Sequence, residues 1–234
     1  MIILRKGNNY TGHFSLAGKK EFQIVSEDGQ HILLMMKPSN DGEKFCDAKL
    51  TEKEKNTIDK PKGISPERIE QCHDPIRVLV LWTQNAEDTG LIPNDIINTA
   101  IGQFNSSIYR SNITSAAALN LVGSQRVNFT ETNTISDDWT ALAVSGNNGV
   151  IRGLRDQVNA DIVVLLTDGN YGNPNGTVGD FSLTANSAYA VVKIADAVGD
   201  KKVFSHEIGH LFDGRHFDDN DGPSYAHSYT IEFP

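Results

Sequence analysis

The sequence predicts an α/β domain built on a twisted, mostly parallel sheet, and two observations support this fold class. From residue 76 onward, strongly apolar runs of strand length alternate with segments whose apolar residues recur at helical spacing. Such alternation is typical of parallel sheets with right-handed crossovers. Before residue 76 the chain has only short strands and a polar stretch. We therefore expect a small β segment at 1–37, a linker at 38–75 and the main domain at 76–234.

The first two parts carry weak structural signals. Residues 8–37 predict a three-stranded meander, because short apolar stretches alternate there with turns at Gly18 and Gly29. Three short strands are too few for a core of their own, so a small β extension packed on the main domain is one interpretation. The linker is polar and broken by proline and glycine, and proteolytic nicking concentrates in such stretches.

The main domain is predicted to open with a strand at residues 76–83, whose continuous apolar run suits burial on both faces. A helix follows from Pro93, where proline suits the first helical turn. Residues 117–129 predict a second strand, residues 150–158 a second helix and residues 161–166 a third strand.

Two further segments precede the most informative motif. Residues 168–187 are rich in glycine, asparagine and serine and predict a long loop, and long loops are functional or disordered. Residues 189–193 predict a short strand.

The composition excludes several classes of protein. The formal net charge is −9, and a nucleic-acid binder needs a clustered basic face, so no nucleic-acid partner is expected. No apolar run approaches the ~18–20 residues of a membrane span, so no membrane partner is expected either. Residues 1–6 are too short for the apolar part of a signal peptide. Nothing in the pattern indicates an oligomeric state.

A His-Glu-x-x-His pattern lies near the C-terminus, at His206, Glu207 and His210. Residues four apart on a helix share one face, so both imidazoles can bind one ion, and the carboxylate beside them can activate a metal-bound water. His216 follows six residues after His210, and Gly214 supplies the turn that brings it back, because glycine enters the left-handed region without strain. Three imidazoles and one open position indicate a catalytic zinc site.

This stretch resembles the metzincin zinc proteases, whose pattern is H-E-x-x-H-x-x-G-x-x-H followed by a Met-turn. Within that clan it is similar to the reprolysin-like bacterial peptidases, specifically the peptidyl-Asp metalloendopeptidase family. Residues 76–83 resemble that family's opening strand, residues 154–166 its helix-to-strand segment and residues 225–229 its loop after the zinc motif. The resemblance covers most of residues 76–229 and, more loosely, residues 8–38.

The resemblance implies several properties beyond the motif. The strand at 189–193 would be an exposed antiparallel edge that pairs with an extended substrate. The small β segment would be the end of a pro-region, the protein would be secreted as a zymogen, and its export signal would lie upstream of residue 1. A protein or peptide would be the partner, as substrate.

Two departures from the family pattern stand out. The glycine expected seven residues after the first histidine is Asp213 here, and Asp tolerates the left-handed region better than most residues. The methionines are Met1, Met35 and Met36, so no Met-turn follows the zinc motif. With 18 residues after His216, we expect a truncated lower subdomain, or a fragment.

The two cysteines, Cys46 and Cys72, leave three interpretations open. They could form one disulfide that closes the linker, because an even count in an exported protein fits a bridge. Alternatively, the Cys46 thiolate could occupy the fourth zinc position until the linker is cut, because thiolate is a good zinc ligand. Two unpaired thiols are the third possibility. Residues 218–222 resemble half of a calcium loop, but they lack its downstream glutamate, which favours a solvated acidic turn.

The predicted function is that of a zinc-dependent endopeptidase. His206, His210 and His216 would hold Zn²⁺, and Glu207 would act as general base toward a zinc-bound water that attacks the scissile carbonyl. The alternative from another class is an inactive or truncated metzincin that serves as a peptide-binding module. A zinc hydrolase acting on other bonds is a further enzymatic alternative.

Overall fold

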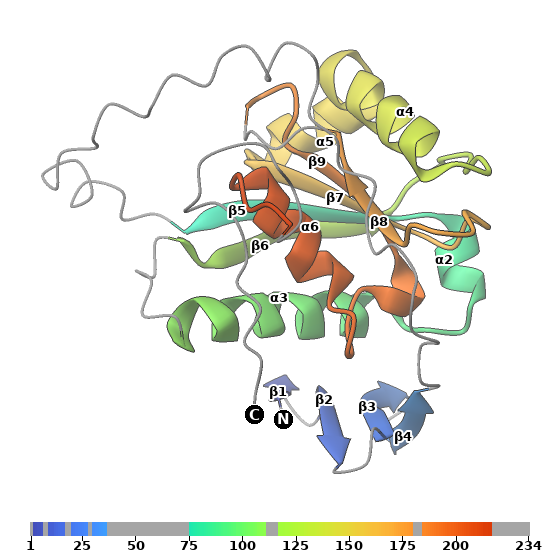
Figure 1. Ribbon diagram of the computed structural model, residues 1–234, viewed down its shortest axis with the longest axis vertical. Helices are drawn as coiled ribbons and strands as arrows, with labels where there is room; N and C mark the ends of the chain where they lie inside the picture. The colour runs from blue at the N-terminus through green and yellow to red at the C-terminus, as the bar shows by residue number, and fades with distance from the viewer. Residues whose placement is uncertain are drawn as a thin grey trace, which may run out of the picture.

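The computed structural model describes residues 75–110, 117–179 and 184–216, together with the backbone of four strands between residues 2 and 36 (Figure 1). The remaining residues include the linker with both cysteines and everything after His216. The expectations about Cys46, Cys72, the acidic turn at 218–222 and the lower subdomain therefore lie outside the described residues.

The centre of the main domain is a five-stranded sheet with the order β6-β5-β7-β9-β8. Three of its four strand pairs are parallel, and β8 pairs with β9 in the antiparallel sense. This confirms the expected mostly parallel sheet with an antiparallel edge. The strands are β5 (Ile76–Trp82), β6 (Leu119–Arg126), β7 (Ile162–Thr167), β8 (Gly176–Val178) and β9 (Tyr189–Lys193).

The edge strand is not the one that the resemblance implied. Strand β9, at 189–193, is parallel to β7 and lies inside the sheet, so its assignment as the antiparallel edge was wrong. Ala190, Val191 and Val192 have no exposed surface, as expected for a strand covered on both faces. The edge is β8, which lies within the segment predicted to be a loop. Its three residues are too few to show a strand period in the sequence.

Helices cover both faces of the sheet (Figure 1). The first apolar cluster joins one face of the sheet to α3 and α6, and the second joins the other face to α4 and α5. The helix from Pro93 and the helix at 150–158 are confirmed, whereas α4 was not predicted. The helices are α2 (Gln84–Asp88), α3 (Pro93–Arg110), α4 (Ile135–Asn148), α5 (Val150–Val158), the short 3-10 helix η3 (Ile194–Asp196) and α6 (Val203–Leu211).

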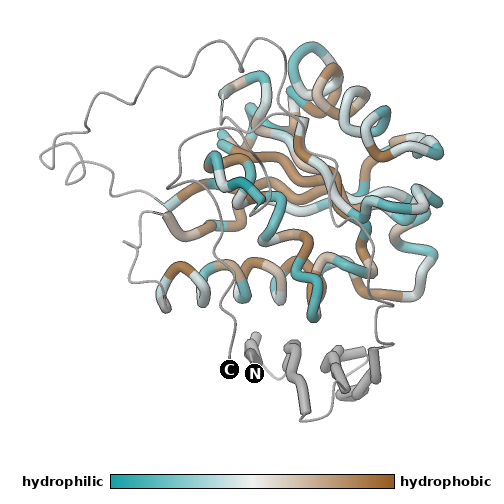
Figure 2. The backbone as a smooth tube through the Cα atoms, viewed as in Figure 1, coloured by the Kyte–Doolittle hydropathy of each residue, from teal (hydrophilic) through white to brown (hydrophobic). Residues whose placement is uncertain are grey.

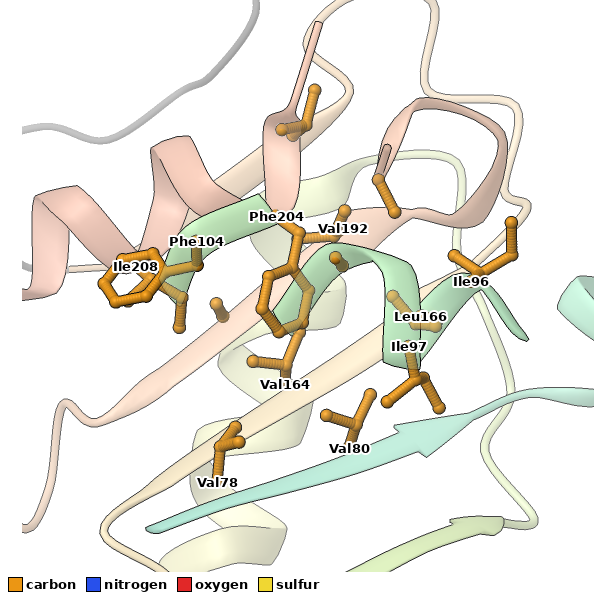
Figure 3. Packing of buried hydrophobic residues seen from close by; sticks show 14 of the residues in the cluster. Val78, Val80, Ile96, Ile97, Phe104, Val164, Leu166, Val192, Phe204 and Ile208 are labelled. Atoms are coloured by element: carbon orange, nitrogen blue, oxygen red, sulfur yellow. The ribbon is translucent and has the colours of Figure 1, made fainter. Parts of the chain in front are cut away.

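Helix α6 is fixed by apolar packing rather than by a polar cap. Phe204 and Ile208 are fully buried and pack with Phe104 of α3 and Val164 of β7, as Figure 3 shows. No side chain caps the N-terminus of α6, which follows Lys202 in a left-handed conformation (φ 48°). Apolar packing also holds the rest of the domain together, since Figure 2 shows the hydrophobic residues concentrated in the central strands.

The N-terminal strands form a separate antiparallel sheet in the order β1-β2-β3-β4. Three of them confirm the predicted meander, and β1 adds a fourth strand. They are β1 (Ile2–Lys6), β2 (Asn9–Leu16), β3 (Lys20–Glu27) and β4 (Gln30–Met36). In the part of the chain that the structure describes, no helix combines the length and apolar character needed to cross a bilayer.

Candidate metal centre

The C-terminal end of α6 turns the chain sharply toward the last predicted ligand. The Gly214 N–H donates to the Gly209 carbonyl at 3.0 Å, and the Asp213 N–H donates to the His210 carbonyl at 2.9 Å. Together these two bonds form a Schellman motif, in which the first residue beyond the helix cap adopts the left-handed conformation. That residue is Asp213, with φ 65°, so the expectation of a left-handed turn at Gly214 is wrong.

Gly214 is required for a different reason. A Cβ atom at this position would lie 2.8 Å from the Gly209 carbonyl oxygen, which is closer than side chains permit. Asp213 in turn does something that glycine could not. The Arg215 guanidinium, whose side chain is only 8% exposed, donates to Asp213 Oδ1 from two nitrogens, at 2.8 Å and 3.2 Å. This ion pair fixes the connection that leads to His216.

The turn brings three imidazoles together at one point. The Nε2 atoms of His206 and His216 are 3.2 Å apart, and those of His210 and His206 are 2.9 Å apart. Ring nitrogens of all three residues lie within 4.8 Å of one another. Nitrogen ligands of a tetrahedral zinc ion, at 2.0–2.1 Å from the metal, are about 3.3 Å apart. The three residues therefore form a group that could hold a metal ion.

The protonation of these rings also suits metal binding. The His210 Nδ1–H donates to the Gly214 carbonyl at 2.5 Å, which leaves Nε2 as the lone-pair atom facing the other rings. Burial, followed by the positive charges of His210 and His216, lowers the pKa of His206 to about 4. The pKa of His210 is also lowered to about 4, mainly by burial. Both rings are therefore neutral at pH 7, the form that binds metals.

Glu207 lies on the inner side of α6 and is completely buried. Neither of its carboxyl oxygens has a hydrogen-bond partner among the described residues, and burial raises its pKa well above the ordinary value. An isolated buried carboxyl group is costly, so its presence beside three imidazoles indicates a role other than folding. This orphaned carboxyl and the converging donor set fit a zinc ion with one position left for chemistry.

Sequence reasoning did not identify Gly176 of β8 as part of this site. A Cβ atom at Gly176 would lie 2.6 Å from Glu207 Oε1 and 2.4 Å from Val203 Cγ1. The absence of a side chain lets the edge strand pack directly on α6 and cover the carboxyl group. Gly176 is one of several glycines in its segment, and nothing in the sequence distinguishes it. The structure brings His206, His210 and His216 together and places Glu207 on the same helix as the first two, and Cys46 lies outside the described residues.

A His-Glu-x-x-His motif on a helix, followed by a third histidine, is the pattern of zinc metallopeptidases. The chain belongs to metallopeptidase family M12B, reprolysin-like, whose family model matches residues 95–217.

Proteins similar to this chain carry related names. It is 26% identical over 246 residues to a peptidyl-Asp metalloendopeptidase of Stenotrophomonas maltophilia (strain R551-3), covering 99% of this chain and 56% of that protein. It is 27% identical over 241 residues to a protein of the same name from Xanthomonas campestris pv. campestris, covering 97% and 55%. The chain thus spans about half the length of these relatives.

A solved structure supports the fold. Metalloproteinase-II from Bacteroides fragilis superposes with a TM-score of 0.52 at 12% identity, covering 93% of this chain and 69% of that one. At this identity the likeness concerns the fold alone.

The lowered histidine pKa values predict how the stability of the metal-free protein depends on pH. Folding favours the neutral rings, so their contribution is complete above the unfolded pKa of about 6.5 and is lost as the pH falls toward 4. Glu207, with its raised pKa, acts in the opposite direction. Chemical denaturation can be measured between pH 7.5 and 4 with a chelator present to remove metal. As the pH falls, the unfolding free energy should decrease more steeply for the wild type than for His206→Gln. An equal dependence on pH in the two proteins would contradict the lowered pKa of His206.

Gly176→Ala should destabilise the protein by about 1–3 kcal/mol, because the new methyl group overlaps Val203 and Glu207, which are both fully buried. The matched control is Gly153→Ala in α5, where a Cβ atom meets nothing within 4 Å. That change should stabilise the helix by about 0.5–1 kcal/mol. Urea denaturation compares the two, and a Gly176 variant as stable as the wild type would show that β8 does not pack tightly on α6.

Proposed function

We propose that this chain carries the catalytic machinery of a zinc-dependent endopeptidase. The single observation that supports this most is the buried carboxyl group of Glu207, which has no partner among the described residues and follows His206 on the helix that carries two of the three converging imidazoles. Membership of a metallopeptidase family agrees with it. A structural zinc site would use a fourth protein ligand and would not need a buried base.

In this proposal His206, His210 and His216 hold the ion through their ring nitrogens. Zinc, when bound, supplies Lewis acidity that makes a water molecule more acidic and polarises a peptide carbonyl. The protein keeps the ligands neutral by burial, and the His210–Gly214 bond fixes the orientation of one ring. Because the imidazoles already lie close together, binding of the zinc ion would need little rearrangement of α6.

Glu207 would accept a proton from water and later return it to the leaving amine. Burial raises the pKa of Glu207, which makes its carboxylate a stronger acceptor for the proton that it later returns. Gly176 lies against its side chain and limits its movement. The Glu207 carboxyl group is therefore oriented by packing rather than by hydrogen bonds.

The edge strand β8 offers a place for an extended peptide. The Lys193 N–H donates to the Asn175 carbonyl at 2.7 Å, and this register directs the backbone groups of Thr177 toward β9. By the alternation of an antiparallel ladder, the backbone groups of Gly176 and Val178 point away from β9. All three residues of β8 are buried in this structure, so a substrate strand would pair with these groups, beside Glu207, once the edge is uncovered. The names of the relatives add cleavage at aspartate as the specificity to test first.

The remaining expectations belong to the same proposal. Residues 1–37 would be the end of a pro-region, 38–75 a cleavable linker and 76–234 the catalytic domain of a secreted zymogen. Cys46 would either hold the fourth position on zinc before cleavage or pair with Cys72.

Glu207→Gln should leave zinc bound and reduce peptide hydrolysis by about a thousandfold or more, because only the proton acceptor is removed. Zinc content by atomic absorption and hydrolysis of casein and of peptides containing Asp or Asn measure the two properties. The wild type should be tested after limited proteolysis of the linker as well as intact. A variant that keeps most of the wild-type rate would exclude Glu207 as the base, and zinc binding without any wild-type hydrolysis would favour a peptide-binding module.

His216→Ala should weaken zinc binding by about a hundredfold or more, because one of three protein ligands is lost. Competition with a fluorescent chelator gives the affinity. His31→Ala, in the N-terminal sheet, is the matched control and should leave it unchanged. Unchanged affinity in the His216 variant would mean that another residue supplies the ligand, and His227 would be the first to test.

A further inference from the structure

The segment between β7 and β8 is fastened to α4 at its start. Tyr171 donates its hydroxyl hydrogen to Asp138 Oδ2 at 2.6 Å, and the Thr132 N–H donates to Oδ1 at 2.7 Å. Asp138 has no exposed surface, and the ring of Tyr171 occupies the space that a side chain at Gly169 would fill. Burial and the bond to Asp138 raise the pKa of Tyr171, so its hydroxyl remains a donor.

The chain is fastened to α4 a second time just after β8 ends. The ring of Trp139 lies so close to Gly179 that a Cβ atom there would be 2.1 Å from it. The indole N–H donates to the Tyr189 carbonyl at 2.8 Å. In the register of β8 and β9, Tyr189 stands opposite Gly179, one place beyond the last pair of the ladder. Trp139 therefore donates a hydrogen bond to β9 at the position where the pairing of β8 with β9 ends.

Strand β8 is thus held from both faces. Helix α4 fixes the chain before and after it through Asp138 and Trp139, and α6 meets it at Gly176 through Val203 and Glu207. A strand of three residues with one neighbour has few hydrogen bonds of its own, so its position depends on these attachments. The attachments on α4 lie on the face of the sheet opposite α6 and touch no predicted zinc ligand.

We propose that Asp138 and Trp139 are positioning residues for peptide binding, which hold the edge strand β8 at the height where a paired substrate backbone meets Glu207. The inference rests on the endopeptidase function proposed above. Neither residue touches the reacting atoms in this account. Loosening either attachment leaves the zinc ligands and the base in place but lets the substrate-pairing edge move, so binding of an extended peptide weakens before the chemical step does.

The test is Tyr171→Phe, which removes only the hydroxyl group that binds Asp138. Its control is Tyr109→Phe on α3, where the side chain is 84% exposed. A hydrogen bond to a carboxyl group contributes about 1.4 kcal/mol or more, equivalent to about tenfold. We expect KM for an extended fluorogenic peptide to rise about tenfold, kcat to stay within about twofold and zinc content to be unchanged. Hydrogen exchange in the peptide that contains β8 should become about tenfold faster.

The two measurements separate this inference from the function on which it rests. If the wild type hydrolyses no peptide, the proposed function fails, and unchanged exchange in the variant overturns the attachment of β8 independently. If the wild type is active, an unchanged KM, or a fall in kcat alone, overturns the positioning role while the endopeptidase function stands. If Tyr171→Phe does not fold, as judged by circular dichroism, Trp139→Phe replaces it with the same expected changes.

Discussion

The contact between the edge strand β8 and helix α6 is the constraint on which the candidate site depends. It is made where Gly176 lies against Glu207 and Val203, and no residue with a side chain fits there. Because the strand comes this close, the carboxyl group is sealed from water and its pKa is raised. A wider separation would leave a hydrated glutamate of ordinary acidity beside the same three histidines.

The buried carboxyl group that the proposed chemistry needs lowers the stability of the fold, and apolar packing of the same helix compensates for this loss. A buried carboxyl without a partner costs several kcal/mol, and clustered imidazoles add to that cost. The opposing contribution comes from the apolar side of the same helix, where Val203, Phe204, Ile208 and Leu211 are fully buried. Each such side chain contributes about 1.5–3 kcal/mol. Helix α6 can thus carry an unfavourable polar side because its other side is firmly anchored.

The sequence predicted those parts of the fold that depend on strong periodic patterns. Strands β5 and β7 are continuous apolar runs, and α3 shows helical spacing after a proline, so all three were recoverable. Helix α4 was missed because it has few buried apolar residues and ends in Ser, Gly and Asn. The identity of the edge strand depends on strand order, a long-range property that no local pattern contains. By contrast, the proximity of the three histidines was expected from their spacing in the sequence. The fit of Gly176 against Glu207, and the transfer of the left-handed turn to Asp213 with Arg215 as its partner, required the packed structure.

The central claim, that the three histidines hold one zinc ion with Glu207 beside it, is tested most directly by X-ray absorption at the zinc edge. Protein reconstituted with one equivalent of zinc should show three imidazole nitrogens at about 2.0–2.1 Å and one further scatterer. His206→Ala should lose one of these imidazoles, whereas Glu207→Gln should keep all three. A wild-type shell with two imidazoles or fewer, or an unchanged shell in His206→Ala, would contradict the account.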